Sequence, residues 1–495
     1  TFATQEESDF LFGNVINTTE IKQQHYSALI TGELFDMSAG PVGAAFGIEY
    51  RENSIDSAND IVRAQGLSAS ESVDLEGDTV GSTWIADAYG EIELPLHDMV
   101  LLNLSGRYTE EKNFGDEATW SAKVQFSPTD YFRVRATAGT TFRAPNLREQ
   151  FLAGQAGVLA GNLDPCVVPS NAVIGGVYDP TADERSARVL ANCIQDGVDP
   201  TALGLQANVL IPTNTGGSDD IKAETSDSFT AGFVFSQPWT DSFDLDIGVT
   251  YFDIEVNDTV EELDSATVLT RCYNDEDNLA SPFCNRITRR GVNPENNTVG
   301  RVDASFVNLG LVTSTGYDIN VRYQNDFEIG NNLWDIQATL TATNYDELLE
   351  QIDDQAPVDN RVGEAGFPEW SWIARINLNT GNWGVVWRSR FVGEFALDEG
   401  DVIQSTNLSR RDPCRTLGGP TDCFDKNAGG STLYHDLSAT YQMDDWAVSL
   451  GIKNLADEHP PLIKQGSGPS RFNYVVQSTY DLYGRRAFLN LQKSF

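Results

Sequence analysis

Six cysteines are the residues whose type and spacing most directly predict chemistry. They occur as three pairs, each inside one long segment: Cys166 and Cys193, Cys272 and Cys284, Cys414 and Cys423. Six cysteines allow about fifteen connectivities, but this grouping predicts three local disulfides. A structural zinc site is disfavoured because no pair has the two-to-four-residue spacing of zinc ligands. We expect each disulfide to stiffen a loop in an oxidising compartment, by about 3 kcal/mol.

The other reactive groups match no known catalytic pattern. None of the four histidines stands in a His-Glu-x-x-His motif, and the chain has neither a Gly-x-Ser-x-Gly motif nor a phosphate-binding Gly-Lys-Ser/Thr motif. The run Asp275-Glu276-Asp277 could hold a calcium ion or contact a cationic ligand, although a plain acidic loop is the expected interpretation. We expect no enzymatic activity and no cofactor.

The composition restricts the classes of protein that fit. The 495 residues carry 33 Lys and Arg against 73 Asp and Glu, a formal net charge of −40, and 10% are aromatic. Nucleic acid is not an expected partner because phosphate contacts need clustered Lys and Arg. A helical membrane span is excluded because no apolar run reaches about 18 residues. The aromatic content also argues against a disordered acidic polymer.

The elements that must position these groups are strands, because most of the chain alternates apolar and polar residues. Residues 120–127, 132–139, 243–250, 370–378 and 446–452 show this period of two most clearly, and it predicts strands with one apolar and one polar face. We predict fifteen strands, at 25–37, 40–53, 82–96, 98–111, 117–128, 131–143, 222–236, 241–256, 305–327, 332–344, 367–380, 383–392, 431–443, 446–454 and 480–495.

The connections between these strands alternate between tight turns and long loops. The expected loops are 54–81, 144–221, 257–304, 345–366, 393–430 and 455–479. Short turns at one end and long loops at the other are typical of an antiparallel transmembrane β-barrel, in which apolar faces meet lipid and polar faces line the lumen. A large soluble all-β protein is the alternative, and it shares the alternation without the asymmetry of the loops.

The barrel interpretation makes a specific prediction about faces. Arg133 and Arg135 are expected on the lumen side. The residues expected to point outward are Trp120, Val124, Val134, Leu245, Ile247, Trp372, Ile376, Val448 and Leu450.

Three segments resemble a known family. The segment Phe142-Arg143-Ala144-Pro145-Asn146 resembles the Phe-Arg-Ala-Pro signature of TonB-dependent outer-membrane receptors. Pro145 is expected to end the strand because it cannot donate a backbone hydrogen bond, and Phe142 is expected at the outer interface. Asn454-Leu455-Ala456-Asp457 is similar to the family's Asn-Leu-Phe-Asp segment, with Ala456 in place of the aromatic residue. The last strand, ending at Phe495, resembles the signal read by the barrel-assembly machinery.

This resemblance implies energised import across the outer membrane of a Gram-negative bacterium. Such receptors bind a scarce, large solute (a ferric siderophore, a cobalamin or a saccharide), and a plug domain inside the barrel responds to the TonB energy-transducing complex. A passive porin-like channel and a surface ligand-binding barrel are the alternatives. The ligand-binding residues are not identified by the sequence, and siderophore and oligosaccharide remain equally open as substrates.

The strand count leads to a further expectation about the whole chain, residues 1–495. No plug is recognisable, and family barrels have about 22 strands, so residues 1–495 are expected to be an amino-terminally truncated barrel of fifteen strands. We expect a strongly curved sheet, either open or closed by pairing of the 25–37 and 480–495 strands.

Overall fold

A large, curved antiparallel sheet dominates the computed structural model. The structure describes residues 4, 6, 16–64, 75–204, 210–274, 279–291, 297–352, 358–396, 428–461 and 479–494. Fifteen strands follow one another through the sheet in chain order. They are β1 (Thr18–Met37), β2 (Gly40–Ala58), β4 (Thr79–His97), β5 (Val100–Glu111), β6 (Gly115–Thr129), β7 (Phe132–Arg143), β12 (Glu224–Ser236), β13 (Phe243–Asn257), β18 (Leu311–Ile329), β19 (Asn332–Gln351), β21 (Trp370–Thr380), β22 (Trp383–Val392), β25 (Thr432–Gln442), β26 (Trp446–Lys453) and β27 (Arg486–Lys493).

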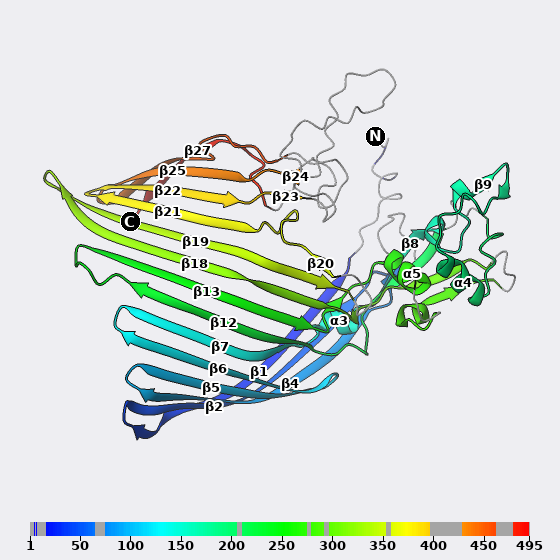
Figure 1. The fold of residues 1–495 in the computed structure, drawn as a ribbon, viewed down its shortest axis with the longest axis horizontal. Helices are drawn as coiled ribbons and strands as arrows, with labels where there is room; N and C mark the ends of the chain where they lie inside the picture. Colours follow the sequence, from blue (N-terminus) through cyan, green and yellow to red (C-terminus); the bar gives the residue numbers. More distant parts are fainter. Residues whose placement is uncertain are drawn as a thin grey trace, which may run out of the picture.

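All fifteen predicted strands are present, one for one. Each pairs antiparallel with its neighbour, as in β12 with β13 and β13 with β18. Seven tight hairpin turns lie together at one end of the sheet, and the other connections, which are long except for residues 112–114, lie at the opposite end (Figure 1). The asymmetry that favoured a barrel over a soluble protein is therefore a property of the fold.

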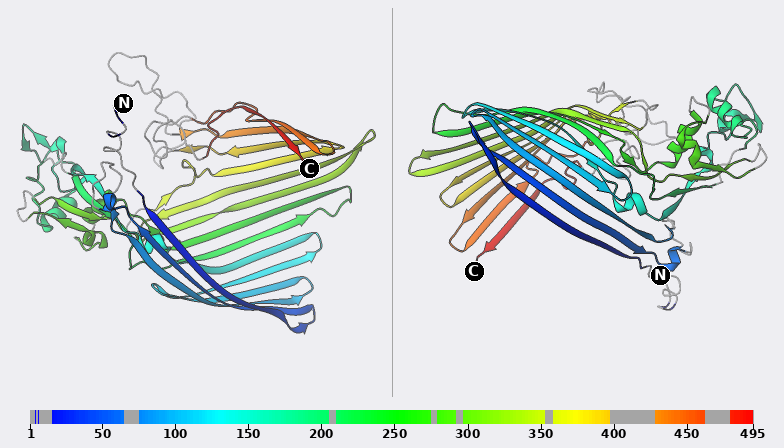
Figure 2. Two further views of the ribbon diagram at one scale, coloured as in Figure 1. Left: turned by 180° about the vertical axis from the view of Figure 1, so that it is seen from behind. Right: turned by 90° about the horizontal axis from the view of Figure 1, so that it is seen from below.

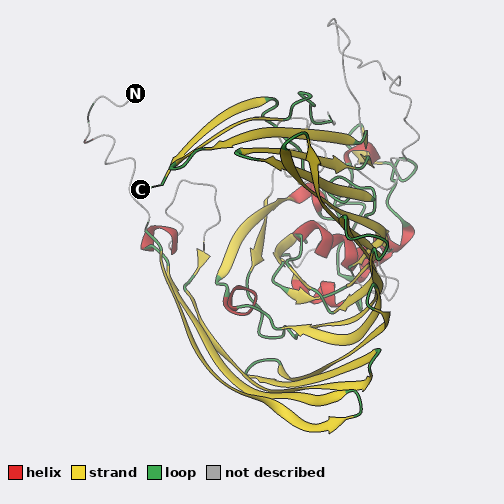
Figure 3. Ribbon diagram, turned by 90° about the vertical axis from the view of Figure 1, so that its left-hand side faces the viewer, coloured by secondary structure: helices red, strands yellow, loops and turns green. Residues whose placement is uncertain are grey.

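The sheet curls into a trough that does not close (Figures 2 and 3). Among the described residues, no ladder joins β1 to β27. Because fifteen strands alternate in direction, β1 and β27 run the same way. The open form is the first of the two outcomes expected from the sequence.

The two faces of the sheet are those that the alternation predicts. Arg133 and Arg135 share the concave face with Arg143, which is on the same strand. The strand register places all nine predicted outward residues on the opposite, convex face. None of the nine is buried, and Trp120 and Leu450 expose 51% and 60% of their surface.

The long connections contain a folded structure, although the sequence predicts only loops there. We call the described residues of 154–221 and 260–309, together with β3 (Leu75–Glu76), the loop unit. Its five-stranded sheet has the order β15-β16-β11-β8-β3. The unit comprises β8 (Gly154–Ala160), η1 (Gly161–Leu163), η2 (Ser170–Ala172), β9 (Val173–Ile174), β10 (Val177–Tyr178), α4 (Ala187–Gln195), β11 (Leu210–Thr215), β14 (Val260–Glu261), α5 (Ser265–Asn274), η3 (Pro282–Arg286), β15 (Ile287–Arg289), β16 (Val299–Asp303) and β17 (Val307–Asn308).

The main buried core of the described chain lies in this loop unit and not in the large sheet. Sixteen buried residues form it, and they come from both long loops. Val268, Leu269 and Val302 are completely buried. The unit lies beyond the ends of the strands (Figure 1) and in line with the concavity when viewed along them (Figure 3).

The remaining elements are short. They are α2 (Ile61–Ala64), α3 (Leu147–Phe151), β20 (Asp359–Asn360), which pairs with β19, β23 (Phe395–Ala396) and β24 (Ala428–Gly429). Within the described part of the chain, no helix has both the length and the apolar character needed to cross a membrane.

Candidate functional site

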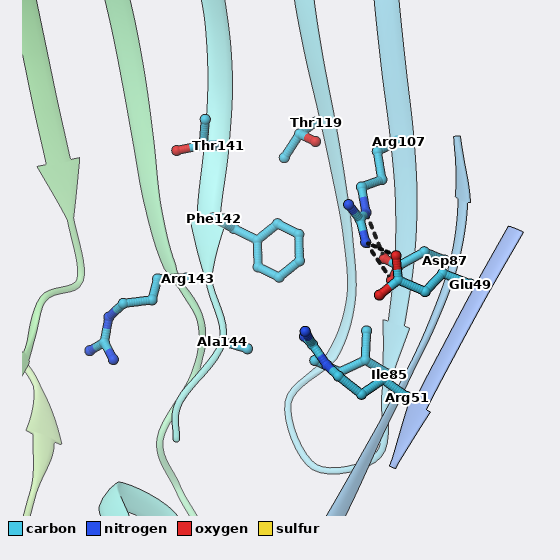
Figure 4. Close-up of a pocket in the computed structure, with 10 residues that line it drawn as sticks. All are labelled: Glu49, Arg51, Ile85, Asp87, Arg107, Thr119, Thr141, Phe142, Arg143 and Ala144. Carbon is cyan, nitrogen blue, oxygen red and sulfur yellow. Dashed lines mark hydrogen bonds and ion pairs between the residues drawn. The ribbon is translucent and has the colours of Figure 1, made fainter. Parts of the chain in front are cut away.

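A cavity of about 580 Å³ opens on the concave face near the loop end of β2 to β7. Its walls carry Glu49, Arg51, Asp87, Arg107 and Arg143 (Figure 4). These residues are brought together by the ladder: Glu49 is opposite Asp87, and Arg51 is opposite Ile85. All five have odd residue numbers, and the odd-numbered residues of these strands form the polar face.

An ion-pair cluster forms one wall of the cavity. Arg107 donates from Nε and Nη2 to the two carboxylate oxygens of Asp87, at 2.8 and 2.6 Å. Its Nη2 is also 3.7 Å from Glu49. Asp87 is 5% exposed and accepts a further hydrogen bond from Thr109. This bidentate geometry holds the planar guanidinium group of Arg107 in a fixed orientation.

The segment after β7 forms the opposite wall. The ladder ends at Arg143, two residues before Pro145, as predicted. Arg143 donates to Glu224 at 2.5 and 2.6 Å and to Glu149 at 3.0 Å. Phe142, which was expected at the outer interface, lines the cavity at the loop end of its strand, and its ring meets the Phe114 ring edge-on at 6.2 Å. Arg143 therefore links the end of β7 to β12 and to α3.

A capping box positions α3 at this wall. The Asn146 side chain accepts hydrogen bonds from the backbone N–H of Arg148 and Glu149, at 2.9 and 3.0 Å. The Glu149 carboxylate accepts in return from the Asn146 backbone N–H at 2.8 Å. This reciprocal pattern satisfies N–H groups that a helix start leaves unpaired. Ala144, Pro145 and Asn146 of the family-like segment thus build a structural corner at the cavity.

A glycine allows α3 to lie close against the sheet. Gly81 of β4 lies beneath the Phe151 ring, and a Cβ at this position would collide with the ring carbons. The Ala153 backbone N–H then donates to Thr79 at 2.9 Å. These contacts join the segment after β7 to β4, which is distant in sequence.

The loop unit above the cavity contains two of the three predicted disulfides. Cys166–Cys193 and Cys272–Cys284 are present. The first lies in the long connection between β7 and β12, and the second lies in the long connection between β13 and β18. The third predicted pair, Cys414 and Cys423, lies outside the described residues, as does the run Asp275-Glu276-Asp277.

A buried arginine joins the two long loops. Arg289, 7% exposed in its side chain, pairs with Asp164 at 2.9 Å and Asp196 at 2.6 Å. It also donates to the Tyr273 hydroxyl oxygen at 2.6 Å. Burial raises the pKa of Tyr273. Burial alone would lower the pKa of Arg289, but the bonds with Asp164 outweigh it and raise the pKa.

The second family-like segment is a buried turn after β26. Asn454 is 1% exposed and has a φ of 50°, a conformation that asparagine adopts more readily than most residues. Its side chain donates to the Glu458 carbonyl oxygen and accepts from the Glu458 N–H, both at 2.8 Å. Leu455 follows, half exposed. Phe495, the third family-like position, is not among the residues that the structure describes.

No ligand-binding residue was predicted from the sequence, and neither was the cavity. Arg51, Asp87, Arg107 and Glu111 all lie on the lumen phase of three consecutive strands. The signal in the sequence that could have indicated this cavity is the recurrence of charged residues on one face of neighbouring strands. Periodicity alone does not give the register that places them opposite one another.

Solved structures similar to this chain include siderophore receptors and a hemophore receptor, all at low sequence identity. The siderophore receptor PirA from Acinetobacter baumannii is 16% identical, with a TM-score of 0.56 over 97% of this chain and 55% of that one. The ferric enterobactin receptor PfeA from Pseudomonas aeruginosa is 14% identical, with a TM-score of 0.59 over 96% of this chain and 55% of that one. The Serratia marcescens hemophore receptor HasR, in complex with HasA and heme, is 12% identical, with a TM-score of 0.52 over 97% and 60%. At these identities the likeness concerns the fold.

The family itself is established by sequence. No curated protein matches the chain, and the chain spans little more than half the length of the solved structures given above. The family model described as "TonB dependent receptor-like, beta-barrel" matches residues 2–455. The chain therefore belongs to the β-barrel family of TonB-dependent receptors.

Proposed function

We propose that this chain is the barrel part of an outer-membrane receptor that binds a scarce solute and imports it with energy from TonB. The observation that carries the proposal is the built cavity on the concave face, which lies at the loop end of the sheet. The disulfide-bonded loop unit stands beyond it, in line with the mouth of the trough. A solute arriving from outside meets these two features first.

The proposal includes partners that this family implies. The convex apolar face contacts outer-membrane lipid, and the barrel-assembly machinery inserts the protein. A plug domain couples the barrel to the TonB complex. Among the described residues, the outer edges of β1 and β27 have no partner strand, and this supports additional strands because lipid does not satisfy exposed backbone groups. We propose a complete barrel of about 22 strands, of which the described part of this chain supplies fifteen.

Iron chelates are the leading substrate class, and oligosaccharide is the second. The similar solved structures include receptors for siderophores and for a heme-carrying hemophore, which supports the first class. The oligosaccharide class is retained because the concave wall is polar over most of its length.

A passive channel would use its loops differently. Porin-type channels narrow their lumen with inserted polar structure, whereas this loop unit packs on its own core beyond the strand ends. This arrangement favours a receptor over a passive channel.

Uptake measurements test the proposal. The full-length receptor is expressed in a Gram-negative host lacking its own receptors, with and without TonB, and supplied with labelled ferric chelates, cobalamin or oligosaccharides. We expect accumulation of one class only when TonB is present. Equal uptake without TonB would establish a passive channel, and tight binding without uptake would establish a surface binding protein.

A further inference from the structure

A second cavity adjoins the one in Figure 4 and has a different character. It measures about 450 Å³ and shares Arg51, Ile85 and Ala144 with the first. Its walls come from β1, β2, β4, β5 and the segment after β7. Ile21, Ile55 and Leu147 line it, so most of the available contact is with aliphatic carbon. This volume is in the range that holds a small-molecule ligand.

Three polar atoms on these walls are buried without a partner among the described residues. They are Arg51 Nε, Thr83 Oγ1 and Glu111 Oε1. Thr83 and Glu111 are only 5% and 3% exposed. The other Glu111 oxygen accepts from the backbone N–H groups of Asn113 and Phe114, at 2.5 and 2.9 Å. That carboxylate is thus held in place with one oxygen free.

The strand register turns the three atoms toward one space. Arg51 is opposite Ile85 on β4, and Ile85 is opposite Glu111 on β5. Thr83 is two residues before Ile85 on β4, so its side chain is the next one on the same face. A buried polar atom without a partner costs about 1–3 kcal/mol, so a ligand that supplies the partners gains that energy on binding.

The charges around both cavities are otherwise paired. Arg107 is bound to Asp87 and Arg143 to Glu224, and Arg148 is 3.1 Å from Glu262. Among the described residues, Arg51 and Glu111 are in no ion pair, and each has one buried polar atom without a partner. One is positive and the other negative, so the two charges balance and the cavity does not favour a charged ligand. The whole chain carries a formal net charge of −40, which repels polyanionic solutes.

An amide satisfies these requirements. It offers an N–H donor for Glu111 and a carbonyl acceptor for Arg51, it is uncharged, and its flanking carbons suit the isoleucine walls. A saccharide also offers donors and acceptors, but hydroxyls cover its surface, and aliphatic walls would leave many of them unpaired. A tris-catecholate iron chelate carries negative charge that only Arg51 could meet.

We propose that the Arg51–Thr83–Glu111 cavity is a binding subsite for an amide group of an uncharged solute. This inference rests on the proposed function and narrows its substrate class. The amide can come from an amide-containing iron chelate or from a peptide, and the experiment separates these two sources.

Calorimetric titration of the full receptor, purified from outer membranes in detergent, tests the subsite. The probes are ferrichrome (an uncharged cyclic hexapeptide iron chelate), an N-acetylated tripeptide amide, a trianionic ferric tris-catecholate and maltohexaose. The variants are Glu111→Gln, which keeps one oxygen for the turn at Asn113 and removes the free acceptor, and Thr83→Val, which is isosteric. Thr137→Val is the control, because Thr137 lies on the same concave phase of β7 outside both cavities.

We expect an uncharged amide probe to bind and each of the two variants to weaken it about tenfold, as loss of one buried hydrogen bond predicts. Thr137→Val should leave the affinity unchanged. Binding of ferrichrome identifies the chelate source, and binding of the tripeptide alone identifies the peptide source. Preference for the tris-catecholate or maltohexaose would overturn the subsite, as would unchanged affinity in both variants.

Two further readouts keep the subsite and the proposed function separable. A cysteine at Thr83 that forms a cross-link to another segment of the resting receptor would show that polypeptide fills the cavity, and this would overturn the subsite. TonB-dependent uptake that persists in the Glu111→Gln and Thr83→Val receptors with unchanged affinity would reject the subsite and leave the import function standing. Uptake that is independent of TonB would reject the import function by itself.

Discussion

At the scale of single residues, the strongest interactions hold the loop unit together. Arg289 is bound to two aspartates, a tyrosine hydroxyl and a backbone carbonyl. Its partners come from both long loops, so one side chain connects segments more than a hundred residues apart in sequence. A buried charge with this many partners is tolerated only while the partners remain in place.

Replacing Arg289 with methionine should destabilise the loop unit by about 3–5 kcal/mol, because the buried Asp164 carboxylate and the partly exposed Asp196 carboxylate lose their counter-ion. Hydrogen exchange of α4, α5 and β16 measures the change. Arg290→Met is the matched control, because Arg290 is exposed and bonds one carbonyl. Equal protection in the Arg289 variant and the control would contradict the assigned role.

The loop unit should also lose stability in strong acid. Hydrogen bonds from the Arg185 guanidinium lower the pKa of Asp183 from 3.8 to about 2. Because the folded pKa is below the unfolded one, this stabilisation is complete above about pH 4 and is lost as the pH falls through 2. Hydrogen exchange at pH 4 and pH 2 should show the loss. Asp183→Asn should reduce the difference between the two pH values, and an unchanged difference would refute the assignment.

At the scale of elements, the strands are specified by the alternation of faces. Val134 is on the convex face and Arg133 and Arg135 are on the concave one, although the three are adjacent in sequence. A one-residue shift in register would exchange the two faces along the whole strand. The need to keep the apolar residues on one face therefore fixes the register of each strand.

Val134→Arg should destabilise the inserted barrel by about 2–4 kcal/mol if residue 134 is near the bilayer midplane. Arg135→Gln is the control on the opposite face and should barely alter insertion. Folding into lipid vesicles, followed by denaturant titration, measures both. A tolerated Val134→Arg combined with a damaging Arg135→Gln would reverse the assignment of the two faces.

At the scale of the whole molecule, the open trough is the main feature. The first and fifteenth strands run in the same direction, so closing this sheet on itself would need a parallel pair, which an antiparallel barrel does not otherwise contain. Additional strands between β1 and β27 would satisfy both edges with antiparallel pairs.

Cysteine cross-linking in outer membranes tests the closure. Thr31→Cys on β1 should form a cross-link with Ala45→Cys, its ladder partner on β2. It should form none with single cysteines placed along β27 (Arg486–Lys493), because other strands separate the two edges. Efficient cross-linking between β1 and β27 would instead establish a barrel of fifteen strands closed on itself.

The sequence by itself determined the strands, their order and their faces. Alternation has a strict period in a strand, and the turns are local, so residues such as Val134 and Arg135 reveal their faces without a partner strand. Cys166–Cys193 and Cys272–Cys284 were predictable because each pair lies within one connection. Pro145 ended its strand by a local rule.

Only the tertiary structure decided where long-range partners meet. The loops at 154–221 and 260–309 fold around a common core that neither can build alone, so α4, α5 and the sheet of β8, β11 and β16 carried no adequate local signal. Arg51, Thr83 and Glu111 become a site because the register of three strands aligns them beside the segment after β7. Register depends on pairing between strands, and pairing is a property of the assembled sheet.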